Sequence, residues 1–158
     1  MKHTCLSYIG KGRLAEISQY GSGDVTSETF ADPRTWRDLG DILLFHPSAV
    51  TRHEASFVIA DLQVPLAERL ISAVKFDTSI VAKHEAAESL GKIEDGDDAW
   101  MAYVFLQRAS DRKNRRYARG VYHCDVQTTV RESLEKLEGR FSVFKDRYEK
   151  RNRIGTFC

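Results

Sequence analysis

Apolar residues recur at spacings of three and four through much of this chain, which is the period of a helix buried along one side. The stretches 51–62 and 82–93 show this pattern most clearly, and they also resemble each other. Each carries a basic residue, then His-Glu-Ala, then apolar residues at matching places. The two histidines, His53 and His84, are 31 residues apart. A period of this length indicates a helical repeat.

Turn and capping signals divide the rest of the chain into further helices. We predict a helix within 1–20 and another that starts at Pro33, with Asp32 as N-cap, and ends at about His46. Further helices are expected over 49–62, from Pro65 to about 76 and from about Ile80 to 93. One more follows the polar turn 94–98, and the last two cover 126–137 and 141–153. Strand patterns are almost lacking. The sequence therefore predicts an all-α fold, a HEAT-like stack (α-α superhelix) of about three helix pairs plus terminal helices.

The 158 residues suffice for one domain or a short repeat array, and we predict a single HEAT-like domain over 1–158. His-Glu repeats are expected around 36–62 and 66–93, a degenerate repeat around 98–139, and a basic insertion at 108–125. In the degenerate repeat, Ser133 aligns with Ser89, and Thr128 and Thr129 take the His-Glu position. Because neither threonine is a useful metal ligand, this repeat is expected to be structural.

Helical geometry places His53 and His84 roughly 160° from the apolar stripes of their helices. Both His-Glu pairs are thus expected to point away from the packed side, on neighbouring helices about 8–10 Å apart. Imidazole and carboxylate ligands suit zinc or iron rather than calcium or magnesium. Phe57 and Glu88, not histidines, follow the two histidines by four residues, which disfavours a zincin-type site. The alternative is that the pairs are repeat consensus without a metal.

Composition narrows the class of protein. With 24 Lys and Arg against 23 Asp and Glu, the chain does not resemble a general nucleic-acid or membrane binder. Cys5, Cys124 and Cys158 are scattered, and we expect them to be reduced thiols. No apolar run has the length of a signal peptide or a transmembrane helix. We therefore predict a cytoplasmic protein without a membrane partner.

A basic stretch at 108–119 contains six basic residues against one acid, Asp111. It is either a solvated loop or a patch for an acidic or phosphate-bearing partner. Tyr117 alone is too little aromatic surface for nucleic-acid stacking. His46, His123 and Cys124 are other ligand-type residues, but they lack a partner in a neighbouring repeat, and His46 before Pro47 is expected to be a cap or surface residue.

The segment Lys83-His84-Glu85-Ala86-Ala87-Glu88-Ser89-Leu90-Gly91, with Arg52-His53-Glu54-Ala55 one repeat earlier, resembles deoxyhypusine hydroxylase. The resemblance covers about 39–141. It implies HEAT-like repeats and a non-haem di-iron centre (Fe²⁺ with O₂) held by paired His-Glu motifs, with zinc the lesser alternative.

Carried over by position, the resemblance implies that His53, His84 and Glu85 ligate iron. It implies that Glu54 faces the amine chain of a substrate, although Glu54 could equally be a metal ligand. Glu88, four residues after His84, could orient that imidazole, or it could pair with Lys92 instead.

The family has two halves of this kind in one chain, and this sequence has one. The resemblance therefore implies a homodimer with iron at or near the interface between the two copies, and a single iron in a monomer is the competing arrangement. The implied activity is an iron-dependent monooxygenase that hydroxylates an amine-bearing, lysine-derived substrate, either a protein or a small amine. The alternatives are a HEAT-like protein-binding scaffold without catalysis and a zinc enzyme, such as a hydrolase, at the same residues.

Overall fold

The computed structural model describes residues 33–94, 96–111 and 123–141, and these residues form helices without any strand. The helices are α2 (Pro33–Phe45), α3 (Ala49–Asp61), α4 (Ala67–Phe76), α5 (Ile80–Lys92), α6 (Gly96–Ser110) and α8 (Cys124–Phe141). The predicted all-α fold is confirmed. The helices predicted within 1–20 and 141–153 and most of the basic stretch lie outside the described residues, apart from Phe141 and 108–111.

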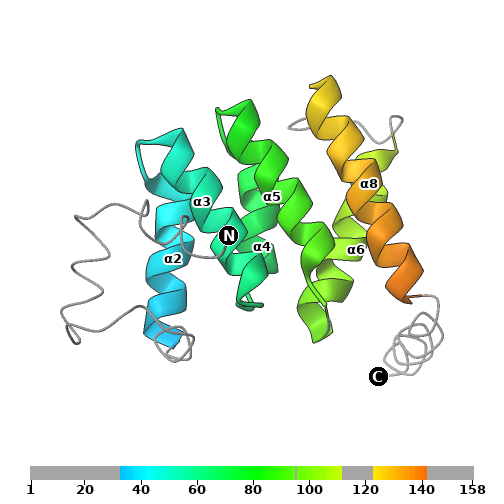
Figure 1. Ribbon diagram of the computed structural model, residues 1–158, viewed down its shortest axis with the longest axis horizontal. Helices are drawn as coiled ribbons and strands as arrows, with labels where there is room; N and C mark the ends of the chain where they lie inside the picture. Colours follow the sequence, from blue (N-terminus) through cyan, green and yellow to red (C-terminus); the bar gives the residue numbers. More distant parts are fainter. Residues whose placement is uncertain (1–32, 95, 112–122, 142–158) are drawn as a thin grey trace, which may run out of the picture.

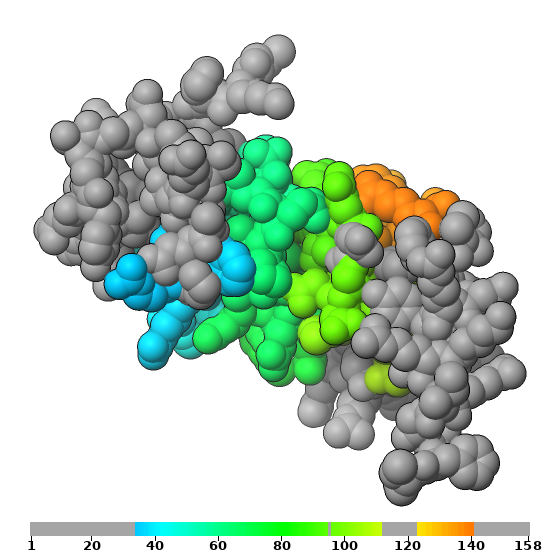
Figure 2. All heavy atoms as spheres, turned by 90° about the horizontal axis from the view of Figure 1, so that it is seen from below, coloured from blue at the N-terminus to red at the C-terminus, as the bar shows by residue number. Residues whose placement is uncertain are grey.

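The helices pack as pairs in two layers (Figure 1). In one layer α5 lies between α3 and α8, and in the other α4 lies between α2 and α6. The pairs α2 with α3, α4 with α5, and α6 with α8 connect the layers. Figure 2 shows the same pairs following one another along the molecule in chain order. This is the predicted stack of helix pairs.

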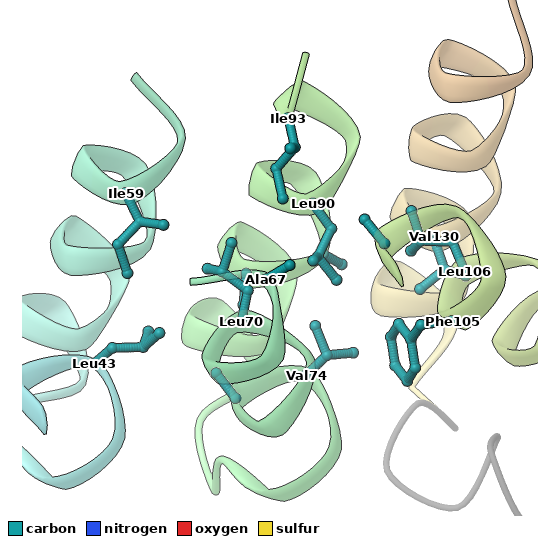
Figure 3. Close-up of a cluster of buried hydrophobic side chains, with 14 of the residues drawn as sticks. Leu43, Ile59, Ala67, Leu70, Val74, Leu90, Ile93, Phe105, Leu106 and Val130 are labelled. Carbon is teal, nitrogen blue, oxygen red and sulfur yellow. The ribbon is translucent and has the colours of Figure 1, made fainter. Parts of the chain in front are cut away.

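A continuous apolar core lies between the two layers (Figure 3). Its largest fully buried side chains include one or more from each of the six helices, namely Leu43, Ile59, Leu70, Val74, Leu90, Leu106, Val126, Val130 and Leu137. Burying a leucine of this kind contributes roughly 1.5–3 kcal/mol. Ala55 and Ala86, the alanines of the two His-Glu-Ala motifs, are fully buried and let the neighbouring helices approach.

Helix starts repeat from one pair to the next. Ser48 and Ser79 are the N-caps of α3 and α5, and their hydroxyl oxygens accept the N–H groups of Thr51 and Ala82 at 3.4 and 3.5 Å. The predicted starts at Pro33 and near Ile80 agree with the structure. These caps set equal heights for the residues that follow in the two helices.

The predicted helix start at Pro65 is wrong, because α4 begins at Ala67. Val64 is buried in the core, and the chain turns tightly after it, with the N–H of Leu66 donating to the carbonyl of Val64 at 2.8 Å. Leu66 offers no side-chain cap. The N–H of Ala67 instead donates to the carboxylate of Asp98 on α6 at 2.9 Å. The second helix pair is therefore capped by the third.

A buried ion pair joins the first two pairs just before His53. Arg52 donates from Nε and from a terminal nitrogen to the two oxygens of Asp77 at 2.7 and 2.8 Å. It also donates to the carbonyls of His46 and Pro47 at 2.6 and 3.2 Å. The ion pair thus fixes the α2–α3 turn against the α4–α5 turn, and with it the start of α3. None of the described helices is long and apolar enough to cross a bilayer.

Candidate metal site

The imidazole of His53 lies between two carboxylates. Its Nδ1 is 3.3 Å from Oε1 of Glu54, the next residue on α3, and its Nε2 is 3.2 Å from Oε2 of Glu85 on α5. A neutral imidazole has one N–H, so it can donate to only one of these carboxylates. The second contact needs an additional proton or a cation. The first and second helix pairs thus meet at a His53–Glu54–Glu85 cluster.

Both carboxylates of this cluster carry an oxygen without a hydrogen-bond partner. Among the described residues, Oε2 of Glu54 and Oε1 of Glu85 are buried and unpaired. The nearest cation to the second of these atoms is Nζ of Lys92 at 3.7 Å, beyond hydrogen-bond distance. A buried acceptor left unpaired costs free energy, and a bound cation would remove that cost.

The raised pKa of Glu85 also favours a bound cation at this position. Burial raises the pKa of Glu85, and the charge of Glu88 adds to this effect. Lys92, His53 and His84 act in the opposite direction without cancelling it. The present neighbours therefore do not fully compensate an ionised Glu85, and a metal ion beside it would favour the carboxylate form.

His84 has different surroundings, and its side chain is 44% exposed. Its Nδ1 lies 2.7 Å from the hydroxyl oxygen of Thr129 on α8, while its Nε2 lies 3.9 Å from Oε2 of Glu88. The carboxylate of Glu88 is 3.1 Å from Nζ of Lys92, and that hydrogen bond lowers the pKa of Glu88. Of the two roles considered for Glu88, the structure forms the pair with Lys92, and the distance to His84 exceeds a hydrogen bond.

The expected orientation of the two His-Glu pairs is right for the imidazoles, which are partly exposed, and wrong for Glu85, which is 6% exposed. Successive helical residues are separated by 100°, so Glu85 turns from the face of His84 into the interface with α3. There it meets His53 of the preceding pair. Glu85, the residue after His84, therefore contacts the histidine of the previous repeat, whereas Glu54 contacts the neighbouring His53.

The structure brings His53, Glu54 and Glu85 together, whereas the contacts of His84 are with Thr129 and Glu88. Three donor atoms within 4.8 Å of one another occur, within the described ranges, at a different place, His123, Cys124 and Asp125. The four predicted ligands therefore do not form a preassembled cluster of three donors. Their chemistry, two imidazoles and two carboxylates, nevertheless suits iron or zinc.

The other ligand-type residues lie apart from this site. His123, Cys124 and Asp125 are consecutive, exposed residues at the N-terminus of α8. Nδ1 of His46 accepts the N–H of Ser48 at 3.1 Å, so this imidazole belongs to the α2–α3 turn, as expected of a cap.

The repeat pattern does not by itself reveal the contribution of Thr129. Thr129 aligns with Glu85, which is the available signal, but a threonine is not a useful metal ligand, so the pattern predicts only a structural role for it. The comparisons with known proteins add no further residue, because no family model, curated protein or solved structure matches this chain.

Proposed function

We propose that this chain is a non-haem iron protein of the deoxyhypusine hydroxylase type that hydroxylates an amine-bearing substrate with O₂. His53, Glu54, His84 and Glu85 would hold the iron. The observation that supports this proposal most is the pair of buried, unpartnered carboxylate oxygens on either side of His53. When bound, iron would supply the reduction of dioxygen that hydroxylation of an unactivated C–H bond requires.

The residues of the chain would supply charge, orientation and exclusion of water. Glu54 and Glu85 give the site a negative charge that attracts a cation, either the metal or the amine of a substrate. Lys92 lies beside Glu85 and Glu88 and also over the ring of Phe57, 5.3 Å from its centroid. Phe57 and Lys92 would therefore shield one side of the proposed site from water.

A homodimer would complete the site, and the exposed apolar residues offer a surface for it. Phe45 and Phe76 are 73% and 72% exposed at equivalent helix ends, and Val50 and Val81 are 52% and 58% exposed at equivalent helix starts. Each member of these pairs is 31 residues from its counterpart. Val50 and Val81 each lie three residues before a site histidine, one turn away on the same helix face.

The size of this apolar surface is compatible with a second copy. The two phenylalanines and two valines, with the exposed Ile80, present on the order of 500 Å² if each aromatic side chain covers roughly 150–250 Å². Two copies packed on each other would then bury about 1,000 Å², close to the lower limit for a specific interface. Such an interface would lie next to both histidines and bring the two sites toward each other.

Metal content tests the proposal directly. Wild-type protein, produced in iron-replete medium without chelators, is expected to contain iron in amounts close to the chain concentration, measured by elemental analysis. His53→Ala and His84→Ala should lose it, whereas His46→Ala, which alters an imidazole outside the site, should retain it. No metal in the wild type, or unchanged metal in His84→Ala, would favour a binding scaffold. Zinc without iron would favour a hydrolase.

The dimer is tested separately by light scattering. Wild-type protein should have the mass of a dimer, and Phe45→Ser with Phe76→Ser should have the mass of a monomer. Met101→Ser is the matched control, because Met101 is an exposed apolar residue on α6, outside this surface. A wild-type monomer that contains iron would rule out the dimer and leave the metal site standing.

A further inference from the structure

We propose that Thr129 is a positioning residue that fixes the tautomer of His84, with the proton on Nδ1 and the lone pair on Nε2. The third repeat would then not be merely structural, because it would determine which atom of the second repeat can bind a metal. The use of Nε2 for metal binding rests on the function proposed above. The tautomer itself follows from hydrogen bonds within the chain.

The hydroxyl of Thr129 makes two contacts and has one hydrogen. Its Oγ1 lies 2.9 Å from the carbonyl oxygen of Asp125 and 2.7 Å from Nδ1 of His84. The carbonyl can only accept, so the hydroxyl hydrogen goes to Asp125. Both contacts are hydrogen bonds only if Nδ1 of His84 carries a proton and donates it to Oγ1. A neutral His84 then has its lone pair on Nε2.

The surroundings of Nε2 agree with this assignment. The carboxylate of Glu88 would be an acceptor for a protonated Nε2, yet it stays 3.9 Å away and pairs with Lys92 at 3.1 Å. The side chain of His84 is 44% exposed, whereas Thr129 is 4% exposed. Nδ1, which contacts Thr129, therefore faces the protein, and Nε2, which carries the lone pair, faces outward.

The packing of α5 on α8 keeps Thr129 within reach of His84. One turn further along α8, Ser133 lies so close to α5 that a Cβ at Gly91 would be 2.6 Å from its Cβ. This close approach needs a glycine on α5. Metal-binding histidines commonly donate their second ring N–H to a protein acceptor, and loss of that acceptor weakens metal binding 10- to 100-fold.

Two substitutions test the proposal, Thr129→Val, which removes the hydroxyl while preserving the branched shape, and Thr129→Ser, which retains it. The tautomer is measured by long-range ¹H–¹⁵N NMR of the metal-free protein at about pH 8.5, well above the ordinary histidine pKa. Wild type and Thr129→Ser should carry the His84 proton on Nδ1. Thr129→Val should shift it toward Nε2, and thermal unfolding checks that both variants fold.

Iron titration of the same three proteins provides the second measurement. Thr129→Val should bind iron 10- to 100-fold more weakly than wild type, and Thr129→Ser should recover most of that loss. A wild-type proton on Nε2, or an unchanged tautomer in Thr129→Val, would overturn the proposal. An Nδ1 proton in a wild type that takes up no metal would uphold the role of Thr129 and refute the iron function.

Discussion

The α3/α5 interface places a carboxylate, Glu85, against the imidazole of the preceding repeat, whereas the α5/α8 interface places a hydroxyl, Thr129, at the same position. Glu85 lies 3.2 Å from Nε2 of His53, and Thr129 lies 2.7 Å from Nδ1 of His84. The chemical consequences differ. The hydroxyl of Thr129 donates to the carbonyl of Asp125 and is the hydrogen-bond partner of Nδ1 of His84. Glu85 and Glu54 together leave two buried oxygens unpaired beside His53.

The two interfaces give the repeat two different roles, one for the proposed site and one for support. The same backbone geometry serves a neutral, internally satisfied contact in one interface and a charged, unsatisfied contact in the other. A buried charge without full compensation lowers stability, and such arrangements persist mainly where they serve binding or chemistry. The unsatisfied interface is therefore the centre of the proposed site, and the satisfied interface holds one of its ligands in place.

The interfaces also differ in how they are held together. The Arg52–Asp77 ion pair is buried and reaches from the first helix pair to the second. The α5/α8 interface depends on the absence of a side chain at Gly91. Substitutions can therefore weaken each interface separately.

The largest effect is expected from Asp77→Ala, which leaves Arg52 without its buried partner. Removing one member of a buried ion pair costs about 3 kcal/mol or more in the free energy of unfolding. Urea unfolding measures this loss. Asp41→Ala is the control, because the Asp41–Arg69 pair is exposed, with a separation of 3.7 Å, and its loss should cost less than about 1 kcal/mol. Equal losses in the two variants would contradict the proposed importance of Asp77.

The contribution of Asp77 should also depend on pH. Burial opposes ionisation of Asp77, but hydrogen bonds from Arg52 and Ser79 and the charges of Arg52 and Lys83 outweigh it, so the pKa of Asp77 is lowered. The stabilisation is therefore present above the ordinary aspartate pKa of about 4 and is lost as the pH falls through the lower folded value. The stability difference between wild type and Asp77→Asn should narrow over that acidic range. A difference that stays constant there would refute this origin.

Gly91→Ala should have the next largest effect and act on the other interface. The new methyl group would meet Cβ and Cα of Ser133 at 2.6 and 2.8 Å, so α5 and α8 must separate. Overpacking of this kind costs about 1–3 kcal/mol. Gly139→Ala, with no atom within 4 Å of the new Cβ, should instead stabilise α8 by up to about 1 kcal/mol. The proton on Nδ1 of His84 should become less populated in Gly91→Ala and be unchanged in Gly139→Ala.

Glu85→Gln should stabilise the metal-free protein, whereas Asp77→Ala and Gly91→Ala should destabilise it. Because burial raises the pKa of Glu85, keeping this carboxylate ionised at pH 7 costs folding free energy, and the neutral amide should stabilise the metal-free protein in urea unfolding. The same variant should lose iron. Glu88→Gln is the matched control, since the pKa of Glu88 is lowered by its bond to Lys92 and its loss should not stabilise. A less stable metal-free Glu85→Gln would show that the cluster is a structural ion pair.

The smallest effects are expected at the far ends of the helices. The side-chain amide of Gln63 donates to the carbonyls of Ala60 and Lys92 at 2.7 and 3.1 Å and accepts the N–H of Glu94 at 2.9 Å. Gln63→Ala should therefore cost about 0.5–1 kcal/mol. Arg140→Ala removes only contacts of 3.3–3.4 Å to the same helix end of α5, and its effect on urea unfolding should be smaller still. A larger loss in Arg140→Ala would reverse the expected order of the two bridges.

The helix pairs could be predicted from the sequence because the signals that define them are local. Ser48 and Ser79 cap helices within three residues of themselves, and Pro33 opens a helix by its fixed φ. The α4 start could not be predicted in this way, since its cap, Asp98, lies 31 residues further along the chain. Local patterns carry no information about such a partner.

The site was predictable in its residue types and less so in its contacts. The 31-residue period identified His53 and His84, but the pairing of His53 with Glu85 rather than with Glu54 alone depends on how two helices face each other. The role of Thr129 does not follow from the sequence, because hydrogen-bonding side chains of every kind can orient a ligand, and residue type alone does not identify them. The alignment of Thr129 with Glu85 is the sequence signal for this contact.

The cap that Asp98 of α6 provides for α4 makes the stability of one helix pair depend on the next pair along the chain. Asp77 of the second pair binds Arg52 of the first, and Asp98 of the third pair caps α4 at Ala67. Each unit is thus finished by its successor. A deletion that removes the third pair should loosen the second and, through it, the first, so that the chain melts as one cooperative body rather than shedding repeats singly.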